Sequence, residues 1–173
     1  MSAQRGEVPA GRLGNMSKTI LKTTLAVVGA AIAGGVASGG GVDDWYATIR
    51  KPRYVPPNAV FPIAWTALYT DIAVTSSAAI NRFRASGDDA KARAYIGALG
   101  ANLVLNAGWS WIFFGKRKPG AAAVAAAVLT ASSADLARRA AAAEPKLGAA
   151  LAPYPLWCGF ATVMATHIWR LNR

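Results

Sequence analysis

The chain is short of charge for its length. Only 16% of its 173 residues are Asp, Glu, Lys or Arg, whereas about 25% is usual in soluble domains. Acidic side chains are the scarcer kind, with 8 against 19 Lys and Arg. Hydrophobic residues make up 54%, and the mean hydropathy is positive. This balance argues against an ordinary soluble domain and favours lipid as the main solvent.

Cysteine and histidine are nearly absent, with one residue of each. A lone Cys158 excludes an internal disulfide, and no CxxC or Cys/His spacing typical of a metal site occurs. We therefore predict no metal centre and no required cofactor. His167 is a conceivable haem ligand, but a hydrogen-bonding role near the membrane surface is favoured because no second ligand is evident.

The excess of cations does not favour nucleic-acid binding. A net charge of +11 would suggest nucleic acid as a partner of a soluble protein. Here the cations lie at the ends of apolar runs, where phospholipid headgroups are found. The main clusters are Arg50, Lys51 and Arg53, then Arg82 and Arg84, then Lys116, Arg117 and Lys118. We predict membrane lipids as partners, and no nucleic acid.

Five apolar segments follow a polar start. They cover about residues 19–38, 58–80, 94–114, 119–137 and 147–169. Each is near the ~20 residues that a helix needs to cross a bilayer, and a spanning backbone must satisfy its own hydrogen bonds. The sequence therefore predicts an all-α membrane protein, a bundle of five transmembrane helices over residues 18–173, after a disordered leader at 1–17. The cations divide too evenly between the two sides to fix the orientation.

The first apolar segment imitates a secretory signal. Lys18 and Lys22 precede a run that ends in GVASGGG, as before a cleavage site. Small residues at close-packing spacing favour an uncleaved helix instead, namely Gly29, Ala33, Gly34 and Ala37. Because no organelle-type leader is evident, we expect a bacterial cell envelope membrane.

The stretch WYATIRKPRYVPPNAVFPIAWTALY, residues 45–69, concentrates aromatics, prolines and cations. Its prolines restrict the backbone and predict a stiff connection. In the helix that follows, Phe61, Trp65 and Tyr69 share one face. An interfacial aromatic belt accounts for Tyr46 and Phe61 but poorly for Trp65, which falls about two turns inside. We interpret the stretch as a cationic cover over an apolar slot.

The third predicted helix has one polar and aromatic stripe. Its members are Asn102, Asn106, Trp109 and Phe113, at steps of four, three and four. Asparagine is unfavourable toward lipid, so the stripe should face the interior or a cavity. Interhelical hydrogen bonding and ligand contact remain equal alternatives for the two asparagines. The opposite face carries Gly97, Ala101 and Gly108, and predicts a homodimer through this helix.

Two acids and two prolines complete the candidates. Asp71 lies near the middle of the second helix, where a carboxylate is expensive; we favour a satisfied structural role over a functional one. Asp135 precedes Arg138 and Arg139 by three and four residues, which predicts a local ion pair. Pro153 and Pro155 should disturb the first half of the last helix.

Three aromatic motifs in one order carry a resemblance. They are WY-x3-RKP-x3-PP-x3-FP-x2-W-x3-Y, then N-x2-W-x3-FF, then PY-x2-W-x2-FA. Together they resemble the TspO/MBR family of tryptophan-rich sensory and translocator proteins, over nearly the whole chain beyond the leader. The resemblance implies a five-helix, usually dimeric bundle that binds porphyrins of the protoporphyrin IX type beneath the first loop, in transport, sensing or stress regulation. Light-dependent porphyrin degradation and proton-coupled export, which would need Asp71, are the alternatives.

The resemblance also implies a binding site. Trp65 and Trp157 match the pocket tryptophans of the family, and they would be the redox partners if the protein is a photochemical enzyme. The ligand-binding residues expected from motifs and spacing are Trp45, Tyr46, Arg50, Lys51, Pro52, Phe61, Trp65, Tyr69, Asn102, Asn106, Trp109, Tyr154, Trp157 and Ala161. The chain departs from the family where Met164-Ala165 replaces Leu-Asn, and where Thr166 stands at the Tyr of the cholesterol-recognition pattern.

Overall fold

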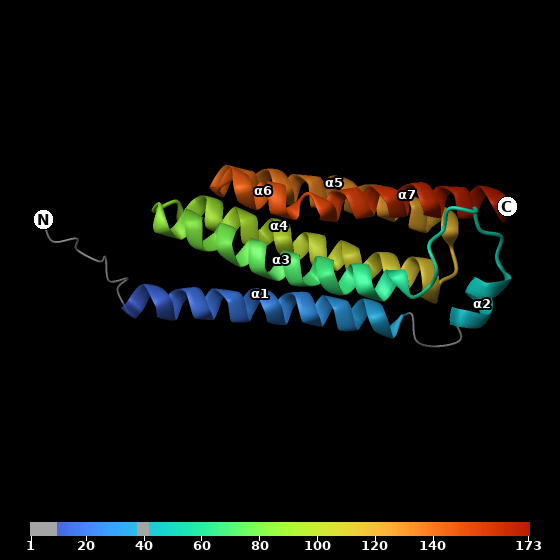
Figure 1. Ribbon diagram of the computed structural model, residues 1–173, viewed down its shortest axis with the longest axis horizontal. Helices are drawn as coiled ribbons and strands as arrows, with labels where there is room; N and C mark the ends of the chain where they lie inside the picture. The colour runs from blue at the N-terminus through green and yellow to red at the C-terminus, as the bar shows by residue number, and fades with distance from the viewer. Residues whose placement is uncertain (1–9, 38–41) are drawn as a thin grey trace, which may run out of the picture.

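The structure, a computed structural model, describes residues 10–37 and 42–173 as helices joined by short connections (Figure 1). The helices are α1 Ala10–Val36, α2 Val42–Thr48, α3 Val60–Ala85, α4 Asp89–Ser110, α5 Pro119–Ala143, α6 Pro145–Leu151 and α7 Pro153–Leu171, and a π-helical turn, η1 Trp111–Gly115, continues α4. Over the described residues the predicted all-α fold is confirmed.

Four stretches of the described residues are long and apolar enough to cross a membrane. They are Met16–Val36, Asp89–Gly115, Pro119–Ala143 and Pro145–Leu171. The second predicted span corresponds to α3, which has 26 residues but does not qualify by apolarity. Its polar residues, among them Asp71 and Thr70, lower its hydropathy. The chain is a multi-pass membrane protein, with four of the five predicted spans recognised by length and composition.

Several boundaries differ from the predicted segments. Residues 1–9 of the predicted leader lie outside the described residues, and the chain is helical from Ala10 onward. The connection after the first span contains α2, a short helix of seven residues that the prolines of the stretch did not suggest. The second and fourth segments continue as helix to Ala85 and Ala143, because Arg and Ala are good helix formers beyond the end of an apolar run.

The last predicted span is broken into two helices. α6 ends at Leu151 and α7 begins at Pro153, since proline lacks the N–H that would continue the hydrogen-bond ladder. The predicted disturbance by Pro153 and Pro155 is thus confirmed. The short α6 packs tightly on α5: a Cβ built on Gly148 would lie 2.4 Å from Cβ of Ala141.

Apolar side chains face both the core and the outside. Ile72, Tyr95 and Leu136 are almost fully buried at the centre of the bundle. Leu25, Ile32 and other large hydrophobic side chains point outward, where they meet lipid rather than water. In Figure 1, α1 runs along one side of α3 and α4, and α5 lies beside α7. The bundle therefore has a packed centre and an apolar outer surface.

Candidate functional site

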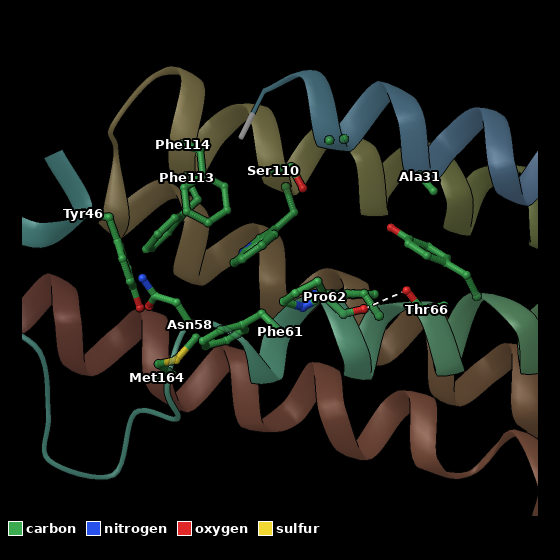
Figure 2. Close-up of a pocket in the computed structure, with 15 residues that line it drawn as sticks. Ala31, Tyr46, Asn58, Phe61, Pro62, Thr66, Ser110, Phe113, Phe114 and Met164 are labelled. Carbon is green, nitrogen blue, oxygen red and sulfur yellow. Dashed lines mark hydrogen bonds between the residues drawn. The ribbon is translucent and has the colours of Figure 1, made fainter. Parts of the chain in front are cut away.

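A cavity of about 590 Å³ lies toward the α2 end of the bundle. Figure 2 shows its walls, which come from α1, α2, α3, the end of α4 with η1, and α7. Its lining residues are Ala31, Gly34, Gly35, Tyr46, Asn58, Phe61, Pro62, Trp65, Thr66, Tyr69, Trp109, Ser110, Phe113, Phe114 and Met164. Its volume is within the usual ~300–1,000 Å³ of small-molecule sites. The lining is mostly apolar and rich in aromatic rings.

The α3 wall is the aromatic face that the sequence predicts. Phe61, Trp65 and Tyr69 recur every four residues, so the helix presents all three to the cavity. The rings of Trp65 and Tyr69 are stacked with centroids 5.3 Å apart. Aromatic stacking holds side chains in place and adds ~0.5–1.5 kcal/mol per pair beyond burial. The face is therefore a preformed aromatic wall of the cavity.

The opposite wall is built where α4 becomes a π-helix. Trp109 and Phe113 stack at 5.4 Å, and Phe114 meets Phe113 edge-on at 4.9 Å. A π-helical turn adds a residue to the helical repeat, and here Phe113 and Phe114 both reach the cavity. The indole Nε1 of Trp109 is buried and has no hydrogen-bond partner among the described residues. The sequence predicts Trp109 but gives no signal for the π-turn.

Tyr46 of α2 closes the end of the cavity. Its ring is buried, and burial raises the pKa of its hydroxyl. The Lys51 ammonium donates to the Tyr46 carbonyl oxygen at 2.7 Å and lies 4.1 Å from the centre of its ring. Lys51 is therefore fixed beside the cavity end, although its own side chain is not part of the lining.

The predicted asparagine stripe faces the interior. Asn102, Asn106, Trp109 and Phe113 are all buried, which confirms the predicted orientation. The two asparagines do not line the cavity. Asn106 accepts from the Tyr69 hydroxyl at 2.7 Å and donates to the Tyr154 hydroxyl at 3.1 Å, and Tyr154 donates to Asn102 at 2.8 Å. Both asparagines therefore form hydrogen bonds between helices.

Trp157 and Ala161, predicted on α7, are not among the lining residues. Trp157 meets Phe61 edge-on at 6.1 Å and Phe160 at 5.6 Å. Phe61 does line the cavity, so Trp157 contacts a residue of the cavity wall without belonging to the lining. α7 reaches the cavity through Met164 instead, at a position where the sequence departs from the family pattern.

The cationic connection is fixed beside the cavity rather than inside it. Trp45, Arg50, Lys51 and Pro52 are outside the lining. Trp45 packs edge-on against Phe113 at 5.8 Å. The backbone N–H of Arg50 donates to Asn172 Oδ1 at 2.9 Å. These residues support the end of the site and leave the Arg50 side chain exposed.

Three polar residues singled out in the sequence lie outside the cavity lining. Asp71 Oδ1 accepts from Thr75 at 2.7 Å, while Oδ2 is buried without a partner among the described residues. His167 Nδ1 is 3.0 Å from the Tyr54 hydroxyl, in agreement with the favoured hydrogen-bonding role. Asp135 forms the predicted local pair, 2.6 Å from Arg138 and 2.5 Å from Arg139.

Other lining residues carry no chemical signal in the sequence. Ala31, Gly34 and Gly35 of α1 leave room because they are small, and Asn58, Pro62 and Thr66 belong to the start of α3 or the residues before it. Small residues are also what close helix packing requires. Composition and spacing therefore could not distinguish a cavity wall from a packing face.

The sequence of the chain matches a known protein family. The family profile described as TspO/MBR family matches residues 23–170. The chain belongs to the TspO/MBR family. It is 30% identical over 158 residues to a tryptophan-rich sensory protein of Cereibacter sphaeroides, covering 91% of this chain and 94% of that protein. It is also 30% identical over 128 residues to the translocator protein of Homo sapiens, covering 74% and 75%.

A third relative is similar over a comparable length. Protein CrtK of Rhodobacter capsulatus is 29% identical over 131 residues, which is 74% of this chain and 78% of that protein. The match of the family profile contains α2 to α6 completely, α7 except its last residue, and the second half of α1. All the residues that line the cavity are therefore within the region that identifies the TspO/MBR family.

Proposed function

We propose that this TspO/MBR protein binds a tetrapyrrole of the protoporphyrin IX type, or a related flat hydrophobic ligand, in the cavity beside Trp65. The observation that carries the proposal is a cavity of about 590 Å³ whose walls are stacked aromatic pairs, Trp65 with Tyr69 and Trp109 with Phe113. Such walls favour a planar, apolar ring. Transport, sensing or stress regulation would follow from this binding.

The charges around the cavity end support an anionic ligand. A tetrapyrrole of this type has carboxylates on one rim, and Lys51 lies beside Tyr46 at the cavity end. Charge-assisted hydrogen bonds from Lys51, Arg50 or Arg53 to these carboxylates would be stronger than neutral ones. Lipid phosphates offer the same chemistry to the same cations, so the carboxylate contact gives orientation more than selectivity.

We also propose that α3 is the fifth span. With 26 residues it is about 39 Å long at 1.5 Å per residue, enough to cross ~30 Å of hydrocarbon. Figure 1 draws it side by side with α1 and α4 over most of their length. Packing against other helices shields polar residues of α3, including Ser76 and Thr75, from lipid.

A homodimer through α4 is a further part of the proposal. Gly97 and Gly108 have no atom within 4 Å of a built Cβ, and Ala101 is exposed. A second bundle could approach this face closely. Replacing Gly97 by Leu should convert a dimer to a monomer in light scattering of the detergent-solubilised protein.

Titration of the purified protein with protoporphyrin IX tests the binding proposal. The fluorescence of Trp65 should be quenched in a saturable way in the dark, and Trp65→Phe should remove much of this change in fluorescence. Illumination of the same sample separates the two roles, because a degrading enzyme bleaches the porphyrin absorbance whereas a binding protein leaves it unchanged. No saturable quenching in the dark would contradict the proposal.

A further inference from the structure

The helix α1 contacts different neighbours in its two halves. In the first half, Thr23 Oγ1 lies 3.2 Å from the carbonyl oxygen of Ala73 in α3, and Arg84 of α3 donates to Thr19 at 3.0 Å. These contacts hold α1 against the second half of α3. The second half of α1 and the first half of α3 are not joined by these contacts.

The second half of α1 contacts α4 and η1 instead. The indole Nε1 of Trp111 donates to the carbonyl oxygen of Ala33 at 2.8 Å. A Cβ built on Gly34 would lie 3.2 Å from Ser110 Oγ, so the two backbones approach closely there. The cavity lies in the space left between this half of α1 and the first half of α3, as Figure 2 shows.

The wall between α1 and α3 is open. Gly35, Pro62 and Thr66 line the cavity and are exposed at the same time. A Cβ built on Gly35 meets no atom within 4 Å. The Thr66 hydroxyl donates to the carbonyl oxygen of Pro62 at 2.8 Å, so its donor is used within its own helix. The opening is therefore lined by small or internally satisfied groups, which suit contact with lipid.

The connection between α2 and α3 is held to α7 and to the residue that follows α7. Asn172 holds Arg50 by two hydrogen bonds, accepting from its N–H at 2.9 Å and donating to its carbonyl oxygen at 2.8 Å. The Tyr54 hydroxyl pairs with His167 at 3.0 Å, and its ring meets Phe160 edge-on. Entry from the aqueous side would have to break these contacts.

We propose that ligands reach the cavity sideways from the bilayer, between α1 and α3, past Gly35, Pro62 and Thr66. The ligand class is a membrane-dissolved planar amphiphile, and this inference rests on the proposed function. Gly35 lies next to Val36, where the first span ends, so the opening is near the headgroup level. An amphiphile can therefore keep its carboxylates among the headgroups while its ring slides in.

Binding rates in lipid nanodiscs test the route. Protoporphyrin IX is mixed in the dark with the full chain, and tryptophan quenching gives kon and koff for the wild type and for Gly35→Leu and Thr66→Leu. Gly29→Leu is the matched control, because Gly29 is also on α1 with free space around it but does not line the cavity. Asn172→Ala loosens the connection to α7.

An obstructed entrance slows both directions equally. We expect kon and koff both to fall, by about tenfold, in Gly35→Leu and Thr66→Leu, because an obstruction raises the barrier in both directions. Both residues also line the cavity, so Kd should change by less than either rate. Gly29→Leu and Asn172→Ala should bind at the wild-type rates. Two variants on facing helices keep the test valid if one of them folds poorly.

Other outcomes would overturn the route. Wild-type rates in both Gly35→Leu and Thr66→Leu, or faster association in Asn172→Ala, would place the entrance elsewhere. A koff that stays at the wild-type value while kon falls would also contradict the route, because an obstructed entrance must slow release as well as entry. If the wild type shows no saturable quenching at equilibrium, the proposed function fails and the route with it.

Discussion

The Tyr69 hydroxyl donates a 2.7 Å hydrogen bond to Asn106 Oδ1. This bond joins the aromatic face of α3, which lines the cavity, to the buried asparagine of α4. Asn106 also donates to Tyr154 of α7, so three helices meet at one amide. The ring of Tyr69 lies toward the cavity while its polar end is satisfied in the core, which keeps this part of the cavity wall apolar.

Removing this bond should destabilise the bundle through an unpaired buried oxygen. Tyr69→Phe leaves Asn106 Oδ1 without its donor and should lower the free energy of unfolding by about 1 kcal/mol. This value lies between the average contribution of a hydrogen bond in a membrane protein and the cost of an unsatisfied buried group in a soluble one. Asn106→Leu should cost more, because Tyr154 loses its donor as well. In the double variant the total loss of stability should be smaller than the sum of the losses in the two single variants. Thermal unfolding in detergent measures this, and strict additivity would show that the bond contributes nothing.

The two pocket tryptophans of the family should behave differently in this chain. Trp65 lines the cavity, whereas Trp157 is outside the lining and contacts Phe61 edge-on. Trp65→Leu should weaken protoporphyrin IX binding by about three- to tenfold, the equivalent of one aromatic pair. Trp157→Leu should lower the thermal stability and change Kd little. Equal losses of affinity in both variants would mean that Trp157 contacts the ligand directly.

The sequence was most informative where periodicity and polarity act together. The four-residue spacing of Phe61, Trp65 and Tyr69 predicts one face, and that face lines the cavity. Asn102 and Asn106 had to avoid lipid, and both are buried in the core. Such arguments work because each involves a single helix and the cost of exposing one group to hydrocarbon.

Relationships between helices could not be predicted in the same way. Whether Trp157 faces the cavity depends on how α7 is rotated after the break before Pro153, which local spacing does not fix. Gly35 lines the cavity because the neighbouring residues of α1, Ala33 and Gly34, contact the end of α4 and η1 rather than α3. The sequence motifs were sufficient to predict the family. The walls of the cavity depend on tertiary packing, which the motifs do not specify.

Two glycines should respond in opposite ways to the same substitution. Gly148→Ala would place Cβ 2.4 Å from Cβ of Ala141 and 2.9 Å from its Cα, so α6 must move away from α5. Overpacking of this kind costs about 1–3 kcal/mol. Gly29→Ala in α1, outside the cavity lining, meets no atom within 4 Å and should gain up to about 1 kcal/mol in helix propensity. Thermal unfolding compares the two, and equal shifts would contradict the close contact of α5 with α6.

The cap of α4 gives a prediction for pH. Asp88 accepts from the Lys91 backbone N–H at 3.1 Å and lies 2.6 Å from the Lys91 ammonium, and these hydrogen bonds hold its pKa below the ordinary 3.8. A lowered folded-state pKa means that the carboxylate stabilises the fold above pH 3.8 and loses this effect as the pH falls through the folded value.

Asp88→Ala should therefore lower Tm at pH 7, and the difference from the wild type should shrink below pH 3.8. Asp88→Asn keeps a capping oxygen without the charge, so it should lose less at pH 7 and should depend less on acid. A Tm difference for Asp88→Ala that stays constant from pH 7 into the acid range would contradict a charged cap.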